Sequence, residues 1–92
     1  MNKKIKAVFT ILNDKGLHTR PSTELVKCAS SFRSHIQLYY RNQIVNAKSL
    51  LGILMLAATK GSKITIEAIG EDAERAVYSI IKLSKMKFNI KY

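Results

Sequence analysis

The spacing of apolar residues switches repeatedly along the chain between every second position and every third or fourth, and this limits the possible folds. Strict alternation is typical of a half-buried strand, whereas apolar residues three and four positions apart form one face of a helix. Alternation covers residues 4–12, 35–41, 44–45 and 64–68, and helical spacing covers residues 21–33, 50–56 and 73–84. The predicted order is therefore β-α-β-β-α-β-α.

Each predicted strand has one apolar face and each predicted helix has one apolar stripe. Helices laid over one side of a mostly antiparallel sheet bury all of these surfaces together, which predicts a two-layer α+β fold. A chain of 92 residues builds one compact core. It shows no linker, internal repeat or low-complexity tract, so we expect a single domain spanning residues 1–92.

Several residues mark where the elements begin and end. Asn13 to Gly16 has the composition of a turn. Pro21 fits the first turn of a helix, where a missing N–H leaves no hydrogen bond unmade. Ser49 and Asp72 precede helical runs and are predicted to cap them.

Composition indicates an ordinary globular protein, with 47% hydrophobic and 24% charged residues. Cys28 is the single cysteine, which excludes an intrachain disulfide and suits a reducing compartment. No apolar run approaches the roughly 18 residues of a membrane-spanning helix. No apolar stretch typical of a signal peptide follows the basic start of the chain. We therefore expect a soluble, cytoplasmic protein that does not bind membranes.

The formal net charge of +10 favours an acidic partner, such as nucleic acid, an anionic membrane or an acidic protein. The 16 lysines and arginines are spread from Lys3 to Lys91 without a dense run. They are not interleaved with aromatic residues that could stack on bases. A small basic nucleic-acid-binding module is therefore a disfavoured alternative.

The segment most informative about chemistry is Gly16 to Ser22, in which His18 stands just before a predicted helix and Arg20 follows two residues later. The first turn of a helix has unpaired N–H groups and the positive end of the helix dipole, which together attract anions. An arginine adds a permanently charged planar group that suits phosphate oxygens. This arrangement predicts a phosphate site at His18.

An imidazole at such a place can act as a phosphoryl acceptor. Histidine is mostly uncharged at neutral pH, and the positive field of the helix disfavours its protonated form, so a ring lone pair stays free to attack phosphorus. The phosphoryl group is then expected to lie over the amides of Thr19 and Arg20, near the Arg20 guanidinium. Because a phosphorus–nitrogen bond is labile, the group can leave again, as a carrier requires.

The string Gly-Leu-His-Thr-Arg-Pro at residues 16–21 resembles the active-site motif of the HPr family, the histidine-containing phosphocarriers of the bacterial sugar phosphotransferase system. Residues 46–56, Asn-Ala-Lys-Ser-Leu-Leu-Gly-Ile-Leu-Met-Leu, look like the serine motif of the same family. The separation of the two motifs and the predicted order of elements also fit, so the resemblance covers almost the whole chain.

The resemblance implies an open-faced sandwich of three helices on a four-stranded antiparallel sheet. It implies that His18 accepts phosphate at Nδ1 from Enzyme I, which draws on phosphoenolpyruvate, and donates it to IIA domains of sugar permeases. Arg20 would orient and neutralise the phosphoryl group. Such a protein is a phosphoryl carrier rather than an enzyme, without a cofactor or metal, and we expect a monomer.

The resemblance also assigns roles around the second motif. Ser49 matches a position that a dedicated serine kinase phosphorylates in some relatives, although it could serve only as a helix cap. Leu51 and Leu54 would contribute to partner docking, although apolar residues at helical spacing are more often core.

One alternative within the family stays open, namely a regulatory, nitrogen-type phosphorelay in which His18 still accepts phosphate. The strongly basic charge departs from the family pattern. The remaining reactive side chains point to no second site, since Cys28 lies on an apolar helix face and His35 has no ligand partners at metal spacing.

Overall fold

The computed structural model describes residues 3–92. Its elements, in chain order, are β1 (Lys3–Thr10), α1 (Thr19–Ser30), β2 (His35–Tyr40), β3 (Gln43–Asn46), α2 (Leu50–Met55), β4 (Lys63–Gly70), α3 (Ala73–Lys85) and the 3-10 helix η1 (Lys87–Asn89). The predicted order β-α-β-β-α-β-α is confirmed, and η1 is an addition that the apolar spacing does not reveal. The predicted domain begins at residue 1, and residues 1–2 lie outside the described part.

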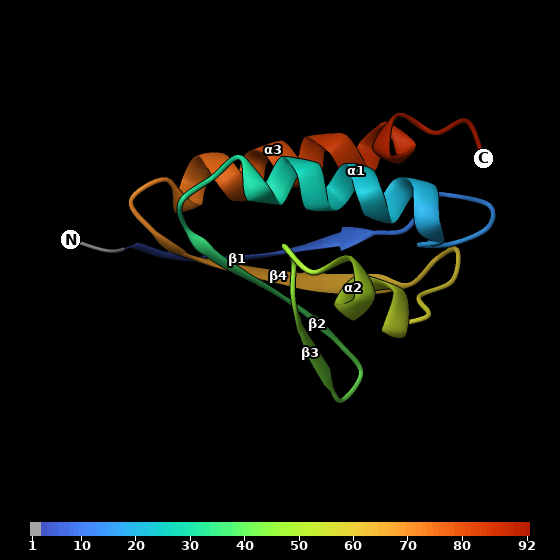
Figure 1. The fold of residues 1–92 in the computed structure, drawn as a ribbon, viewed down its shortest axis with the longest axis horizontal. Helices are drawn as coiled ribbons and strands as arrows, with labels where there is room; N and C mark the ends of the chain where they lie inside the picture. The colour runs from blue at the N-terminus through green and yellow to red at the C-terminus, as the bar shows by residue number, and fades with distance from the viewer. Residues whose placement is uncertain (1–2) are drawn as a thin grey trace.

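The four strands form one antiparallel sheet in the order β1-β4-β2-β3. Helices α1 and α3 lie side by side over one face of this sheet, and α2 packs against α1 and β3 (Figure 1). No helix of residues 3–92 covers the opposite face, so the predicted open-faced, two-layer α+β architecture is confirmed.

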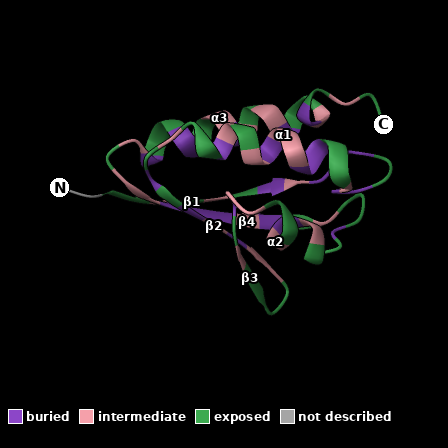
Figure 2. Cartoon of the chain, viewed as in Figure 1, coloured by how far each residue is buried: buried purple, intermediate pink, exposed green. Residues whose placement is uncertain are grey.

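The core lies between the helices and the sheet (Figure 2). The inward positions of the strands alternate as the sequence predicts, because side chains on a strand point to opposite faces in turn. The apolar side chains with no exposed surface are Ile11, Leu25, Ala29, Ile36, Leu38, Ala47, Ile53, Ile64, Ile66, Ala68, Ala73, Ala76, Ile80 and Phe88. Burial of this set is the main stabilising contribution to the fold.

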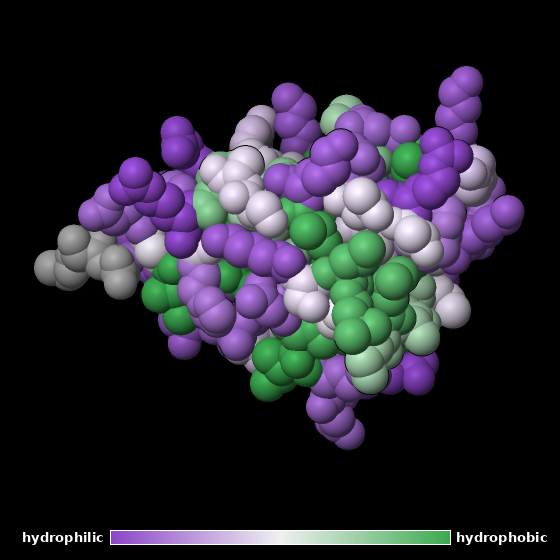
Figure 3. Space-filling view, viewed as in Figure 1, coloured by the Kyte–Doolittle hydropathy of each residue, from purple (hydrophilic) through white to green (hydrophobic). Residues whose placement is uncertain are grey.

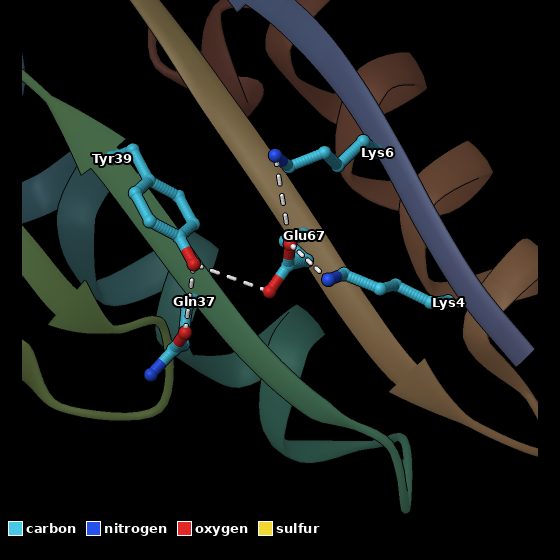
Figure 4. A network of polar contacts seen from close by, with 5 residues as sticks. All are labelled: Lys4, Lys6, Gln37, Tyr39 and Glu67. Atoms are coloured by element: carbon cyan, nitrogen blue, oxygen red, sulfur yellow. Dashed lines mark hydrogen bonds and ion pairs between the residues drawn. The ribbon is translucent and has the colours of Figure 1, made fainter. Parts of the chain in front are cut away.

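The open face of the sheet is held together by a polar network around Glu67 (Figure 4). The Glu67 side chain is only 8% exposed and lies 3.6 Å from the ammonium of Lys4 and 3.8 Å from that of Lys6. The hydroxyl of Tyr39 lies 3.1 Å from the Glu67 carboxylate and donates to it. Two lysines and a phenol therefore compensate a carboxylate that is mostly shielded from water.

Several element boundaries differ from those predicted. Helix α1 begins at Thr19 rather than Pro21 and ends at Ser30 rather than near residue 33. Strand β1 ends at Thr10, because Ile11 exchanges main-chain hydrogen bonds with the loop residues Gly61 and Ser62 instead. The earlier start of α1 matters most, because it places Thr19 and Arg20 inside the first turn.

Asp72 occupies the N-cap position of α3, as predicted, but its carboxylate makes no cap hydrogen bond. It accepts instead from the main-chain N–H groups of Arg33 and Ser34, both at 2.9 Å. The prediction of side-chain capping is therefore wrong, because the loop between α1 and β2 offers the same carboxylate nearer donors. Ser49 does cap α2, accepting from the N–H of Gly52 at 3.1 Å.

Across residues 3–92, no helix combines the length and the apolar character needed to cross a membrane.

Candidate functional site

His18 is the N-cap residue of α1, with extended backbone angles (φ −80°, ψ −171°). Its carbonyl oxygen accepts the first helical hydrogen bond, from the N–H of Ser22 at 3.1 Å. Its imidazole makes no cap hydrogen bond, and no residue of the first turn is acidic. The positive end of the helix therefore has no carboxylate of its own in that turn, and its free N–H groups are those of Thr19 and Arg20.

Gly16 and Leu17 fix the main-chain conformation of the segment that precedes His18. Gly16 has a φ of +69°, and a Cβ at this position would overlap the carbonyl oxygen of Ala58. The N–H of Leu17 donates to that same carbonyl at 2.9 Å, and the Leu17 carbonyl accepts from the Ser22 hydroxyl at 3.0 Å. These bonds tie the segment before His18 both to the loop after α2 and to α1 itself.

The two imidazole nitrogens of His18 differ in their surroundings. Nε2 is buried and has no hydrogen-bond partner among residues 3–92, whereas Nδ1 does not combine burial with the lack of a partner. A phosphoryl donor therefore has no direct path to Nε2. When the proton of the neutral ring sits on Nε2, the lone pair of Nδ1 is free to react.

Tyr92 covers one face of the imidazole, which the sequence gives no reason to expect. The two rings are stacked, with centroids 5.6 Å apart and planes inclined by 16°. The Tyr92 hydroxyl accepts a hydrogen bond from Nη1 of Arg20 at 2.7 Å. Tyr92 thus contacts both His18 and Arg20, the two residues that the sequence predicts as members of one site.

The surface around His18 is basic. Lys15 places its ammonium 4.9 Å from the centre of the Tyr92 ring. Asp14 forms an ion pair with Lys60 at 2.9 Å, and this hydrogen bond and charge lower the pKa of Asp14. None of the ion pairs among residues 3–92 engages Lys15 or Arg20. Both cations therefore remain available to an anion.

The three main hollows among residues 3–92 lie away from His18. A hollow of about 880 Å³ lies at the other end of α1, lined in part by Ser31, Ser34 and Asp72. Neither this hollow nor two smaller ones beside α3 includes His18. His18 itself is half-buried.

Comparison with known proteins identifies the family. The family model described as the phosphorylation site of the HPr component of the phosphotransferase system matches residues 5–85. The chain belongs to the HPr family. Its members are phosphocarriers rather than enzymes in the usual sense.

Solved HPr structures resemble this one closely. An HPr from Thermoanaerobacter tengcongensis is 35% identical, with a TM-score of 0.90 over 96% of this chain and 99% of its own. The phosphocarrier protein HPr from Bacillus anthracis is 34% identical, with a TM-score of 0.82 over 86% of this chain and 94% of its own. A second T. tengcongensis structure, described as an HPr dimer, is 40% identical, with a TM-score of 0.74 over 85% of this chain and 90% of its own.

The second HPr motif forms α2, whose surface is apolar (Figure 3). Leu51 is 69% exposed and Leu54 is half-buried, so the two predicted docking residues differ in accessibility. Met55 at 66% and Leu50 at 37% are also exposed, and the apolar spacing alone does not distinguish Met55 as a docking residue. We call these residues, Leu50, Leu51, Leu54 and Met55, the α2 patch.

The other reactive side chains lie apart from His18. Cys28 is half-buried against the core, and burial raises the pKa of its thiol, which makes it a poor nucleophile. His35 is exposed at the start of β2. Within residues 3–92, no three His, Cys, Asp or Glu side chains lie together as metal ligands would.

Proposed function

We propose that this protein accepts a phosphoryl group on Nδ1 of His18 and passes it to another protein. The observation that carries the proposal is that the imidazole of His18, at the N-terminus of α1, and the guanidinium of Arg20 both contact Tyr92, while Nε2 is buried. Membership of the HPr family supports the same reading.

In the proposed step, the Nδ1 lone pair attacks phosphorus and a new phosphorus–nitrogen bond forms. The bond between phosphorus and the donor breaks at the same time, and its electron pair leaves with the donor. The ring keeps its proton on Nε2. The N–H groups of Thr19 and Arg20 and the guanidinium of Arg20 stabilise the phosphoryl oxygens, because positioning and charge stabilisation dominate such transfers.

By resemblance to the family, the donor is Enzyme I charged by phosphoenolpyruvate, and the acceptors are IIA domains of sugar permeases. His18 lines none of the three hollows described above, which suits a protein partner better than a small ligand, because a small ligand would bind in a concave pocket. The unpaired charges of Lys15 and Arg20 suit acidic partner surfaces, so docking is salt-sensitive.

We propose further that the α2 patch meets these partners and that Ser49 is a regulatory phosphorylation site. Helix α2 packs against α1, so the patch lies on the element next to the helix that His18 precedes. Ser49 is half-buried at the start of α2, where a phosphate would add negative charge beside the patch. Such a charge would repel an acidic partner.

The test is incubation of the protein with Enzyme I and phosphoenolpyruvate. The expected product is an acid-labile, base-stable phosphate on the wild-type protein and none on His18→Ala. His35→Ala is the matched control, since it removes the chain's other histidine, which is exposed, and should label normally. Normal labelling of His18→Ala would refute the proposal.

A further inference from the structure

The chain after α3 turns back toward the start of α1. Lys87, Phe88 and Asn89 have φ angles of +53°, +55° and +64°, a left-handed conformation that residues other than glycine seldom adopt. Such a run persists only where the surrounding structure compensates for it. Figure 1 shows the C-terminal residues on the same side of the molecule as the beginning of α1.

Two contacts hold this turn in place. Phe88 is fully buried and packs edge-on against Phe9, with ring centroids 6.2 Å apart. Asn13, which is also fully buried, donates from Nδ2 to the main-chain oxygens of Lys87 at 2.9 Å and Tyr92 at 3.3 Å. Both ends of the tail segment are therefore fixed by the loop that precedes His18.

The result is that Tyr92 contacts both groups of the proposed phosphate site. Its ring stacks on the His18 imidazole, and its hydroxyl accepts from Nη1 of Arg20. The ring also lies beneath the ammonium of Lys15 and within 5.8 Å of the guanidinium carbon of Arg20. A single aromatic side chain thus joins the acceptor, the arginine and a lysine of the basic surface.

We propose that Tyr92 is a positioning residue for phosphoryl transfer at His18. The inference rests on the proposed function and adds a residue to it. Stacking restricts rotation of the imidazole and keeps Nδ1 directed away from the enclosed side of the ring. The hydroxyl occupies one N–H of Arg20, and the remaining guanidinium donors stay free for phosphoryl oxygens.

Preorganisation of this kind accelerates the chemical step rather than partner docking, because the groups are already placed when the donor arrives. The Tyr92 side chain forms and breaks no covalent bond. Loss of its hydroxyl should leave the imidazole stacked but release Arg20, whereas loss of its ring should release both groups.

The experiment uses phosphoramidate as a small phosphoryl donor, so that no protein docking is involved. Attack by Nδ1 breaks the phosphorus–nitrogen bond of phosphoramidate, and ammonia leaves with the bonding electron pair. The variants are Tyr92→Phe and Tyr92→Leu, and Tyr78→Phe is the control, because Tyr78 is 68% exposed on α3. Thermal unfolding of each variant verifies that it is folded.

The expected labelling rate is about threefold lower for Tyr92→Phe and about tenfold lower for Tyr92→Leu, with Tyr78→Phe unchanged. With Enzyme I as donor, kcat falls and KM stays the same. In the Arg20→Ala background, Tyr92→Phe has no further effect, because the hydroxyl acts through Arg20. The ring protons of His18 shift in the NMR spectrum of Tyr92→Leu, because the ring current of Tyr92 is lost.

Wild-type rates for both Tyr92 variants would overturn the inference. Faster labelling would also overturn it, because the Tyr92 ring would then obstruct access of the phosphoryl donor to His18. An effect of Tyr92→Phe that persists undiminished without Arg20 would exclude action through the guanidinium. A separate result tests the proposed function: if His18→Ala is still labelled, His18 is not the phosphoryl acceptor. The outcomes above refute only the positioning role of Tyr92.

Discussion

The carboxylate of Asp72 accepts hydrogen bonds from both the main-chain N–H and the hydroxyl of Ser34, and so joins the start of α3 to the loop before β2. These bonds and that from the N–H of Arg33 lower the pKa of Asp72 from 3.8 to about 2, with the Ser34 hydroxyl as the largest cause. A carboxylate with a lowered pKa stabilises the folded state while it is ionised.

The first prediction concerns acid stability. The contribution of Asp72 is fully present above pH 4 and is lost as the pH falls toward 2, because protonation then removes the negative charge that strengthens these hydrogen bonds. Asp72→Asn should therefore lower the free energy of unfolding at pH 7, and its difference from wild type should shrink between pH 4 and pH 2. Urea unfolding at several pH values measures this. Glu71→Gln, an exposed neighbour, is the control, and a pH-independent difference for Asp72→Asn would contradict the assignment.

The second prediction concerns Gly16, whose φ of +69° and close approach to Ala58 leave no room for a side chain. Gly16→Ala should cost about 3 kcal/mol of unfolding free energy and slow labelling of His18, because the segment must move. Gly61 also has a positive φ, +89°, but a Cβ there would contact nothing within 4 Å. Gly61→Ala should therefore cost only about 1 kcal/mol and leave labelling unchanged. Equal effects of the two variants would show that the contact with Ala58 is unimportant.

The architecture could be predicted from the sequence because each strand and helix carries its own apolar period. Ile36 and Leu38 alternate with polar neighbours and are fully buried, and the face of α3 that includes Ala76 and Ile80 is likewise buried. His18 and Arg20 could be predicted as a pair because they are neighbours in the chain, so the start of one helix places them both.

Tyr92 could not be predicted, because its position depends on contacts between distant parts of the chain. It reaches His18 only through the left-handed run at 87–89 and the burial of Phe88 against Phe9. Asp72 shows the same limit. Its place before α3 is visible in the sequence, but its hydrogen-bond donors belong to a loop that folding brings near.

The third prediction separates capping from regulation at Ser49. Ser49→Ala removes the acceptor for the N–H of Gly52 and should cost about 1 kcal/mol, with little change in labelling. Ser49→Asp keeps an acceptor but adds a charge beside the α2 patch, so it should raise KM for Enzyme I. Ser30→Asp, an exposed serine at the end of α1, adds the same charge elsewhere and should have no such effect. Equal KM values for the two aspartate variants would refute the regulatory proposal.

The fourth prediction tests docking by the α2 patch. Leu51 is 69% exposed, so Leu51→Ala should barely change stability but should raise KM for Enzyme I. Labelling by phosphoramidate should be unchanged, because that donor does not dock. Ile53 lies in the same helix and is fully buried, so Ile53→Ala should instead cost about 2–5 kcal/mol. If Leu51→Ala and Met55→Ala both leave KM unchanged, the patch does not contact Enzyme I.

The most direct test of the proposed function is to identify the atom that carries the phosphate. Protein labelled with 15N in its histidine rings and phosphorylated by Enzyme I can be examined by NMR, in which coupling to phosphorus identifies the bonded nitrogen. We predict coupling to Nδ1 of His18, because Nε2 is buried. Coupling to Nε2 of His18, or to either nitrogen of His35, would contradict it.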